Sequence, residues 1–472
     1  MAERKLFAGA RLRNLRKDEN LSQRDFAKRL GISASYLNQL ENNQRPLSAA
    51  VMLALVDNFE IDLTSFAEDE SIRLAADLNE ALAEPILAGH RPSKQETKAA
   101  MAHAPEFVRA LLAFHTGYQN LKNSLVSLND ILEKGQIPAI PLPYEEVRDF
   151  FHYSDNYFDS LDKAAEARAR EVGIDGIKNK SAAVDRLAEK HGISVSFERG
   201  KLPGETLSEL HPDSKRLIIN TAHPEPSQTF LLWHQIALLE DTDEIDRIVD
   251  EAGFQTPEGR SIARMALANF SAGATIMPYG EFLAIASDLR HDLELLASKF
   301  GASLEQVAHR LSTLQRTGAK GVPFYFMRVD RAGAITKRHS TTRLQFARYG
   351  GACPLWNVHQ AFETPGEIVR QLAETPDGER YVCIARTITK RGQGFNAPIR
   401  RYAIALGSPV EYVKDIVYGD DLKVNLLEAY DKIGISCRIC NRTECPQRAV
   451  PPIDRNILVD THTRRIVPFR IE

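Results

Sequence analysis

The chain has 472 residues and a formal net charge of −3, with 43% hydrophobic and 26% charged residues. This composition is typical of a globular protein and argues against a disordered or fibrous chain, and the length predicts about three domains. Since neither a run of about 18 apolar residues nor a secretory leader occurs, we expect no membrane span and no secretion.

The cysteines indicate the redox compartment of the protein, and the distribution of charge indicates the kind of partner that it binds. Five cysteines, three of them within residues 437–445, do not make the framework of a disulfide-rich protein, so we expect a reducing cytoplasm. Residues 1–50 contain ten Lys and Arg against five Asp and Glu, whereas the rest of the chain contains 50 against 58. A basic first module on an acidic body predicts an anionic partner for that module.

Residues 7–66 have the pattern of several short amphipathic helices. In the stretch LSQRDFAKRLGISASYLNQLENN, Ser22 is placed to cap one helix, Gly31 to end it and Ser33 to cap the next. The apolar positions that face inward are Phe26, Ala27, Leu30, Tyr36, Leu37 and Leu40. Two short helices joined by a tight glycine turn predict a helix-turn-helix, whose second helix enters the major groove of DNA.

The same stretch resembles the helix-turn-helix of phage repressors nearly position by position. The resemblance implies that Arg16 pairs with Glu41 in a structural role. It also implies DNA contacts from the start of the first helix and from the second helix, namely Gln23, Ser33, Ala34, Ser35, Asn38 and Gln39. Because Ala34 and Ser35 are short, we expect Asn38 and Gln39 to make most base contacts. A small helical protein-interaction module is the alternative.

A long helical segment is predicted from about residue 94 to residue 134. Its apolar residues recur in steps of four and three, at Phe107, Leu111, Phe114, Tyr118, Leu121, Leu125, Leu128 and Leu132. A heptad seam of this length predicts one partner helix. In a DNA-binding protein a second copy of the chain is the natural partner, which gives a homodimer. The alternative is a helix packed inside its own bundle.

Residues 141–300 show the order helix, strand, strand pair and helix, and the last helix contains FLLWHQIALLE. This order resembles the ImmA/IrrE-type metallopeptidases, in which His234 would begin the H-E-x-x-H motif. A hydrolytic zinc site needs a second His, a carboxylate ligand and a Glu base. Leu238, Leu267 and Gln235 stand at those three positions, in that order. We therefore expect no metal at His234 and no catalysis, in a fold whose emptied cleft near Trp233 holds a ligand or a packed core.

From about residue 301 onward the pattern changes to strands and loops. Five cations surround the loop RGQGFNAPI, namely Arg386, Lys390, Arg391, Arg400 and Arg401. Guanidinium groups and backbone N–H groups beside glycines suit the phosphates of a small polyanion. A solvated hairpin face is the alternative.

The segment CRICNRTECPQRAVPP places Cys437, Cys440 and Cys445 in C-x2-C-x4-C spacing. A C-x2-C pair is a common half of a zinc site. The fourth ligand would come from Cys353 or His359, farther back in the chain. Three thiolates also suit an iron–sulfur cluster, and packed reduced cysteines remain the alternative.

The stretches CPLWNVHQAF, RRYAIALG and CRICNRTECPQRA resemble the C-terminal domain of the short-chain fatty acyl-CoA regulators, and the order of all three regions fits that family. The propionyl-CoA carboxylase regulators are the most similar members. The resemblance implies a cytoplasmic transcription factor, not an enzyme, which binds a double-stranded DNA operator. Its effector would be a short-chain acyl-CoA, with propionyl-CoA favoured. The acyl group would lie near Trp233 or beside residues 324–326.

The expected fold is therefore multidomain and mainly α, with α+β parts. Residues 1–66 form an all-α helix-turn-helix domain, residues 67–140 a helical linker and dimerisation region, residues 141–300 a degenerate ImmA/IrrE-like α+β domain, and residues 301–472 a C-terminal α+β acyl-CoA sensor domain. Two other functions remain open. One is a DNA-tethered metallopeptidase, against which the lost metal ligands count, and the other is a phage-type repressor without a small ligand.

Overall fold

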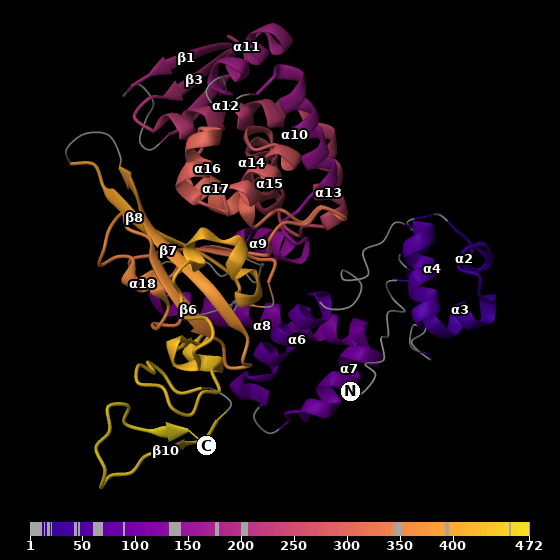
Figure 1. The fold of residues 1–472 in the computed structure, drawn as a ribbon, viewed down its shortest axis with the longest axis vertical. Coiled ribbons are helices and arrows are strands. Elements are labelled where there is room, and N and C mark those ends of the chain that lie inside the picture. Colours follow the sequence, from indigo (N-terminus) through magenta and orange to yellow (C-terminus); the bar gives the residue numbers. More distant parts are fainter. Residues whose placement is uncertain are drawn as a thin grey trace. The chain divides into compact units, whose positions relative to one another are not determined.

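The computed structural model describes residues 12–13, 15–16, 19, 21–41, 45, 48–59, 69–87, 90–131, 143–174, 179–199, 206–342, 344, 352–391, 396–452 and 455–471. The chain separates into two compact units, residues 1–139 and residues 140–472. Figure 1 shows the helices and strands of both. Within the described residues, no helix combines the length and the apolar character that crossing a membrane requires.

The first unit begins with the predicted helix-turn-helix. Its helices are α2 (Gln23–Arg29), α3 (Ala34–Glu41) and α4 (Ala49–Phe59). The hydroxyl of Ser22 accepts a hydrogen bond from the backbone N–H of Asp25 (3.2 Å), and that of Ser33 accepts one from Tyr36 (3.1 Å). Gly31 has a φ of +67°, the left-handed conformation that favours glycine. Both predicted caps and the glycine turn are confirmed.

The small core of this motif comes from one side of each helix. Its fully buried members are Leu12, Phe26, Leu37 and Leu55, with Leu40 almost so. Burying each of these side chains stabilises the fold by about 1.5–3 kcal/mol. Their packing therefore fixes the angle between α2 and α3.

The rest of the first unit is helical and departs from the prediction at one point. It contains α6 (Asp69–Leu82), η1 (Pro85–Leu87), α7 (Lys94–His103) and α8 (Pro105–Ile131). The helical segment predicted from residue 94 onward is present up to residue 131 but is divided into two helices, since the chain breaks at Ala104 (φ −138°, ψ 52°) and restarts at Pro105. Proline suits the first turn of a helix but not its interior, because it has no N–H to donate. Leu132 lies outside the described residues.

The second unit opens with helices, two of which pack against a small sheet. Its elements up to residue 311 are α9 (Pro143–Tyr153), α10 (Asp159–Val172), α11 (Asn179–His191), β1 (Ser194–Glu198), β2 (Ser208–His211), β3 (Arg216–Asn220), α12 (Glu225–Glu240), α13 (Thr242–Ala252), α14 (Pro257–Ile276), α15 (Tyr279–Asp288), α16 (Leu293–Phe300) and α17 (Leu304–Leu311). The strands lie in the order β1-β3-β2, with β1 parallel and β2 antiparallel to β3. The predicted order of helix, strand, strand pair and helix is confirmed.

A six-stranded sheet follows, in the order β5-β4-β8-β7-β6-β9. The elements of this part are β4 (Tyr325–Asp330), β5 (Ile335–Ser340), α18 (Asn357–Gln360), β6 (Val369–Glu374), β7 (Arg380–Arg391), β8 (Ile399–Pro409), η2 (Val410–Asp415), η3 (Val417–Gly419), η4 (Leu427–Ala429), β9 (Asp431–Lys432), η5 (Cys437–Ile439), β10 (Ile457–Leu458) and β11 (Arg470–Ile471). The predicted hairpin with its turn at residues 330–333 is present as β4 and β5.

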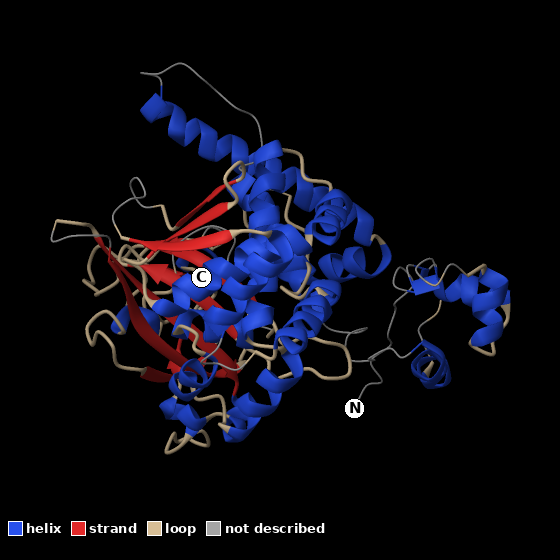
Figure 2. Cartoon of the chain, turned by 90° about the horizontal axis from the view of Figure 1, so that it is seen from above, coloured by secondary structure: helices blue, strands red, loops and turns tan. Residues whose placement is uncertain are grey.

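Alternation along the strands gives this sheet two different faces. One face presents Phe326, Ile404 and Leu406 to the core that the helices share. The other presents Met327, Ala405 and their neighbours to Trp356, beside α18. Most helices of the second unit gather on the first side (Figure 2). A side chain on β4, β7 or β8 therefore faces either the helices or the opposite side according to its register.

Candidate functional site

The second helix of the helix-turn-helix carries its polar side chains away from the core. Ser33, Ser35 and Asn38 are exposed, and Ala34 and Gln39 are half-buried, whereas Leu37 and Leu40 are buried on the other side. This arrangement leaves short and amide side chains on the outer face of α3. Amide side chains can bind the edge of adenine in the major groove.

Gln23 has a structural partner inside the motif. Its Nε2 donates a hydrogen bond to Oε2 of Glu41 (2.8 Å), and Nε of Arg16 lies 2.6 Å from Oε1 of the same carboxylate. The predicted pair of Arg16 with Glu41 is therefore confirmed. Burial tends to raise the pKa of Glu41, but the hydrogen bonds from Arg16 and Gln23 prevail and hold that pKa below its usual value.

The apolar seam of α8 is partly exposed over its described part. The side chains of Phe107 and Phe114 are 77% and 76% exposed, while Leu111 and Tyr118 are half-buried. The face of α8 that packs within the unit carries Val108 and Leu112, and Leu111 of the seam also packs against that core. Leu121, Leu125 and Leu128 lie on α8, but their side chains are outside the described set.

The former peptidase position on α12 is closed. His234 is 7% exposed, and burial lowers its pKa to about 4 against an opposing interaction with Asn269, so the ring is neutral at pH 7. Trp233 and Leu267 are fully buried, and Leu238 is half-buried. Among the described residues no three or more His, Cys, Asp or Glu side chains are arranged to hold a metal ion. Trp233 thus lies in the core, where sequence reasoning had placed a ligand contact.

A buried ionic network at the end of α12 escaped sequence reasoning. The carboxylate of Glu240 accepts hydrogen bonds from Nε and Nη2 of Arg186 (2.8 Å each), lies 3.0 Å from Nε2 of His191 and lies 3.2 Å from Nε of Arg168. Burial opposes ionisation, but these partners lower the pKa of Glu240 to about 2. Because the partners are 49 to 72 residues away in sequence, no local pattern announces them.

The five cations predicted around residues 386–401 do not form one cluster. On the antiparallel pair β7 and β8, Lys390 lies opposite Arg400 on the face toward the helices, and Arg401 lies opposite Thr389 on the other face. Arg386 is ion-paired with Glu294 of α16, and Lys390 with Glu305 of α17 (2.7 Å). Arg391 ends β7 but its side chain is outside the described set, as are Gly392 and Gly394.

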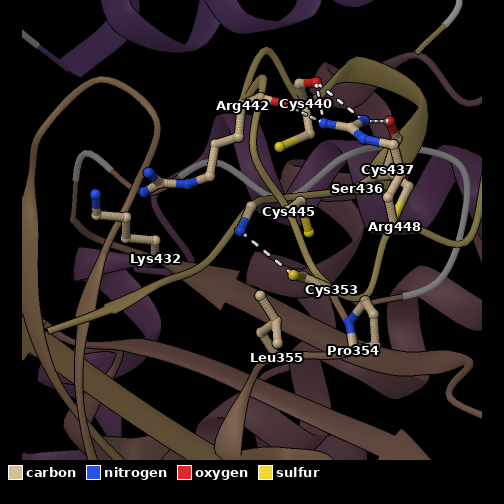
Figure 3. Close-up of a pocket in the computed structure, with 11 residues that line it drawn as sticks. Cys353, Pro354, Leu355, Lys432, Ser436, Cys437, Cys440, Arg442, Cys445 and Arg448 are labelled. Carbon is tan, nitrogen blue, oxygen red and sulfur yellow. Dashed lines mark hydrogen bonds between the residues drawn. The ribbon is translucent and has the colours of Figure 1, made fainter. Parts of the chain in front are cut away.

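Four free thiols meet at one pocket in the C-terminal part (Figure 3). Cys353, Cys437, Cys440 and Cys445 line it, together with Arg442 and Arg448 among others. His359, the alternative fourth ligand, is not part of its lining. The thiols share the pocket without converging on one point as metal ligands would.

The backbone around this pocket is held by two kinds of contact. Arg448 donates to the carbonyl oxygens of Cys437 and Cys440 (3.4 Å), which closes the C-x2-C loop. The N–H of Gly434 donates to Sγ of Cys353 (3.3 Å). Burial raises the pKa of the Cys353 thiol, and the neighbouring Cys437 and Cys440 raise it further.

Comparison with known proteins gives three matches in chain order. Residues 12–66 match the helix-turn-helix family, residues 188–312 the IrrE N-terminal-like domain, and residues 313–469 the C-terminal domain of the short-chain fatty acyl coenzyme A regulators.

Relatives match along almost the whole length. The chain is 49% identical to a propionyl-CoA carboxylase regulator of Cereibacter sphaeroides, over 99% of both chains. It is 39% identical to the HTH-type transcriptional regulator PrpR of Mycobacterium tuberculosis, over 98% of this chain and 95% of the relative. A solved structure of a Mycobacterium tuberculosis transcriptional regulator covers 70% of this chain and 99% of its own, with 40% identity and a TM-score of 0.67.

Proposed function

Because this chain belongs to the short-chain fatty acyl coenzyme A regulators, we propose that it controls transcription in response to a short-chain acyl-CoA, with propionyl-CoA as the favoured effector. The observation that carries the proposal is the full-length match to a propionyl-CoA carboxylase regulator, with all three family regions in order. The genes under its control would then be those through which the cell uses the same acyl unit. A peptidase function has no support from the former metal position, where His234 lacks its partners.

DNA binding belongs to the helix-turn-helix. The exposed Ser33, Ser35 and Asn38, with the half-buried Ala34 and Gln39, supply the proposed contacts of α3. Gln23 stands at the N-terminus of α2, where helix N–H groups favour a phosphate. Its amide nitrogen already donates to Glu41, so we propose that Gln23 orients this helix end and meets DNA through its remaining polar atoms.

Dimerisation is proposed through the seam of α8. An apolar residue left 77% exposed, such as Phe107, costs solubility unless a partner covers it. Phe114 lies two turns along the same side of the helix. A second copy fits this seam, because a symmetric dimer places two recognition helices on the two halves of a pseudo-palindromic operator.

We propose that the effector binds the C-terminal part, where cations lie on the six-stranded sheet, on the face that the helices cover. Of the five predicted cations, Arg386, Lys390 and Arg400 lie on the face toward the helices. Arg386 is ion-paired with Glu294, and we retain Lys390 and Arg400 as candidates for the phosphates of coenzyme A. Arg401 lies on the opposite face and Trp233 lies inside the core, so neither is retained. The buried Phe324 and Phe326, at the start of β4, pack in the core on that same face, whereas Tyr325 lies on the other face.

The four thiols remain a predicted site for zinc or an iron–sulfur cluster. Their number and type suit either group, because four thiolates are a complete ligand set and Arg442 and Arg448 offset the negative charge. Since the thiols do not converge in this structure, binding would require them to move together. When bound, such a group would supply a cross-link between residue 353 and the loop of residues 437–445. The chain's own contribution is the closed C-x2-C loop that Arg448 holds through two carbonyl oxygens.

The test of the function is direct. Fluorescence anisotropy with a labelled DNA fragment from upstream of the gene, and with propionyl-CoA, coenzyme A or palmitoyl-CoA added, should show binding that changes with propionyl-CoA alone or most strongly with it. Each added methylene is worth only about 0.8 kcal/mol until the acyl chain meets a wall, so a short closed pocket selects against long chains. DNA binding that ignores every short acyl-CoA would rule out the sensor function and leave a regulator without this effector.

A further inference from the structure

One carboxylate holds three cations at the contact between the helices and the six-stranded sheet. Oε1 of Glu305, in the first turn of α17, lies 2.7 Å from Nη1 of Arg328 and 3.7 Å from Nζ of Lys337. Its Oε2 lies 2.7 Å from Nζ of Lys390. The three cations come from three strands, β4, β5 and β7, and each of them reaches the same helix.

The sheet register puts like charges directly opposite each other on this face. Arg328 pairs with Lys337 across β4 and β5, and Lys390 pairs with Arg400 across β7 and β8. Like charges in directly opposed positions destabilise a sheet. The ring of Tyr402 relieves part of this repulsion, since the guanidinium of Arg328 lies 4.6 Å and the ammonium of Lys390 6.0 Å from its centroid.

The other charged and titratable groups on this face do not neutralise the excess. Asp330 uses one carboxylate oxygen to accept from the backbone N–H groups of Ala332 and Ala334 in its own turn (2.9 Å each). Arg386 is paired with Glu294 of α16. The neighbouring His309 and His339 are half-buried and contact each other, Nε2 to Nε2, at 3.1 Å.

Both histidines are neutral near pH 7 and therefore add no further positive charge to this face. Burial lowers the pKa of His309 to about 3, with Lys337 contributing, and lowers that of His339 as well. Partial burial also lowers the pKa of Lys337, which Glu305 opposes and which Arg328 and Lys390 reinforce. Arg328, Lys337 and Lys390 therefore share the single negative charge of Glu305. The remaining positive charge favours the binding of a further anion.

The cluster is open to a ligand on its ammonium side. The side chains of Lys337 and Lys390 are 43% and 47% exposed, whereas those of Arg328 and Glu305 are 14% and 13% exposed. The two ammoniums stand on flexible stems and can turn toward an incoming anion. The less exposed Arg328 is already oriented, because its Nε donates to Oγ1 of Thr336 (2.8 Å).

We propose that Arg328, Lys337 and Lys390 form a subsite for a phosphate or pyrophosphate group, and that Glu305 is the internal anion with which this group competes. The proposal rests on the proposed function, since coenzyme A is the phosphate-bearing ligand considered there. Competition would loosen the ion pairs between α17 and three strands of the sheet. A ligand bound at the subsite therefore changes how the helical part and the sheet are held together.

Calorimetry on the full chain tests the subsite. The probes are coenzyme A, propionyl-CoA and inorganic pyrophosphate, all at one ionic strength. The double variant K337Q/K390Q should weaken the binding of all three by at least about tenfold, because two charge-assisted contacts are lost. E305Q should tighten binding several-fold, since the competing charge is gone. R401Q, on the opposite face of the same hairpin, is the matched control and should stay within about twofold of wild type.

The outcomes separate the subsite from the function. Propionyl-CoA bound equally well by wild type and K337Q/K390Q overturns the subsite and leaves the acyl-CoA function standing. Pyrophosphate bound through Lys337 and Lys390, with no acyl-CoA bound at all, supports the subsite and overturns the function. Weaker binding by a folded E305Q protein overturns the competition. Melting curves establish whether each variant is folded. If K337Q/K390Q does not fold, K390Q alone replaces it, and its binding of propionyl-CoA and of pyrophosphate is interpreted in the same way.

Discussion

Nη2 of Arg316 lies 2.6 Å from Oδ2 of Asp162, a fully buried carboxylate 154 residues earlier in the chain. Nη2 of Arg310 lies 2.7 Å from the other oxygen of the same carboxylate. Arg316 belongs to the region that matches the family's C-terminal domain, and Asp162 belongs to α10. One buried charge on a helix thus holds both the end of α17 and the segment that leads into the six-stranded sheet.

Replacing Asp162 by Asn should therefore destabilise the whole second unit. The change leaves Arg310 and Arg316 without their shared counter-charge, and breaking a buried ion pair on one side costs about 3–5 kcal/mol. Urea unfolding of the full chain measures the loss. Asp159→Asn is the matched control on the same helix, because its side chain is 49% exposed and pairs with Lys163 on the surface. Equal stability of the two variants would contradict the role of Asp162.

The pair of Arg16 with Glu41 predicts a pH dependence for the helix-turn-helix. The pKa of Glu41 in the folded chain is below its ordinary value of 4.5, so the folded state binds the proton less readily than the unfolded one. This contribution to stability is present above pH 4.5 and is lost as the pH falls through the folded value. Hydrogen exchange of α2 and α3, corrected for intrinsic rates, should show protection falling in that range.

The variant E41Q supplies the control for that pH dependence. It should lower protection at pH 7 by about 1–3 kcal/mol and flatten the acid loss, because no titrating group remains at the centre of the motif. An unchanged acid profile in E41Q would assign the pH dependence to other carboxylates.

Local sequence patterns predicted the helices and strands of this chain well. They could not predict which residues pair over long distances in the sequence. Ser22 and Ser33 announce the two helices because a cap acts within three residues. The break before Pro105 was also present in the sequence, although the heptad seam obscured it. By contrast, Asp162 is 154 residues from Arg316, and no short-range pattern carries that pairing.

The candidate effector site shows the same division. Composition drew attention to the cations around residues 386–401, yet the period of two along β7 and β8 sends Lys390 and Arg401 to opposite faces. Glu305 could not be connected to Lys390 before the packing of α17 on the sheet was known. The gathering of Cys353 with Cys437 depended likewise on tertiary packing, and only the C-x2-C half was legible in the sequence.

Base recognition should depend on Asn38. Asn38→Ala should lower affinity for the cognate DNA fragment by about 1–3 kcal/mol if its amide binds a base edge. The loss on unrelated DNA should be small, because contacts to phosphate are shared by all sequences. Asn58→Ala, at an exposed position of α4, is the matched control for the same chemical change. Equal losses on both DNAs would make Asn38 a backbone contact.

The exposed seam of α8 should hold the dimer. Changing Phe107 and Phe114 to Glu places charge in the proposed apolar interface and should yield monomers in light scattering, with helical content unchanged, since both side chains are exposed in the single chain. Ala113→Glu is the control, at an exposed position of the same helix away from the seam. A dimer that persists in the Phe variant would place the interface elsewhere.

The thiol pocket should bind one metal centre per chain. Protein purified without oxygen or chelators should contain zinc, or iron with acid-labile sulfide. Cys440→Ser should abolish this metal content, because Cys440 is the more buried thiol of the C-x2-C pair.

Cys383→Ser is the matched control, since this thiol is fully buried in β7 and does not line the pocket. Burial raises the pKa of Cys383 to about 12, which keeps it a neutral thiol at pH 7. Metal content should therefore survive in the Cys383 variant, and the melting temperature of the Cys440 variant should fall to that of chelator-treated wild type, because a bound centre stabilises only the folded loop. Wild type that contains neither metal, or metal that survives in Cys440→Ser, would leave the four residues as packed reduced cysteines.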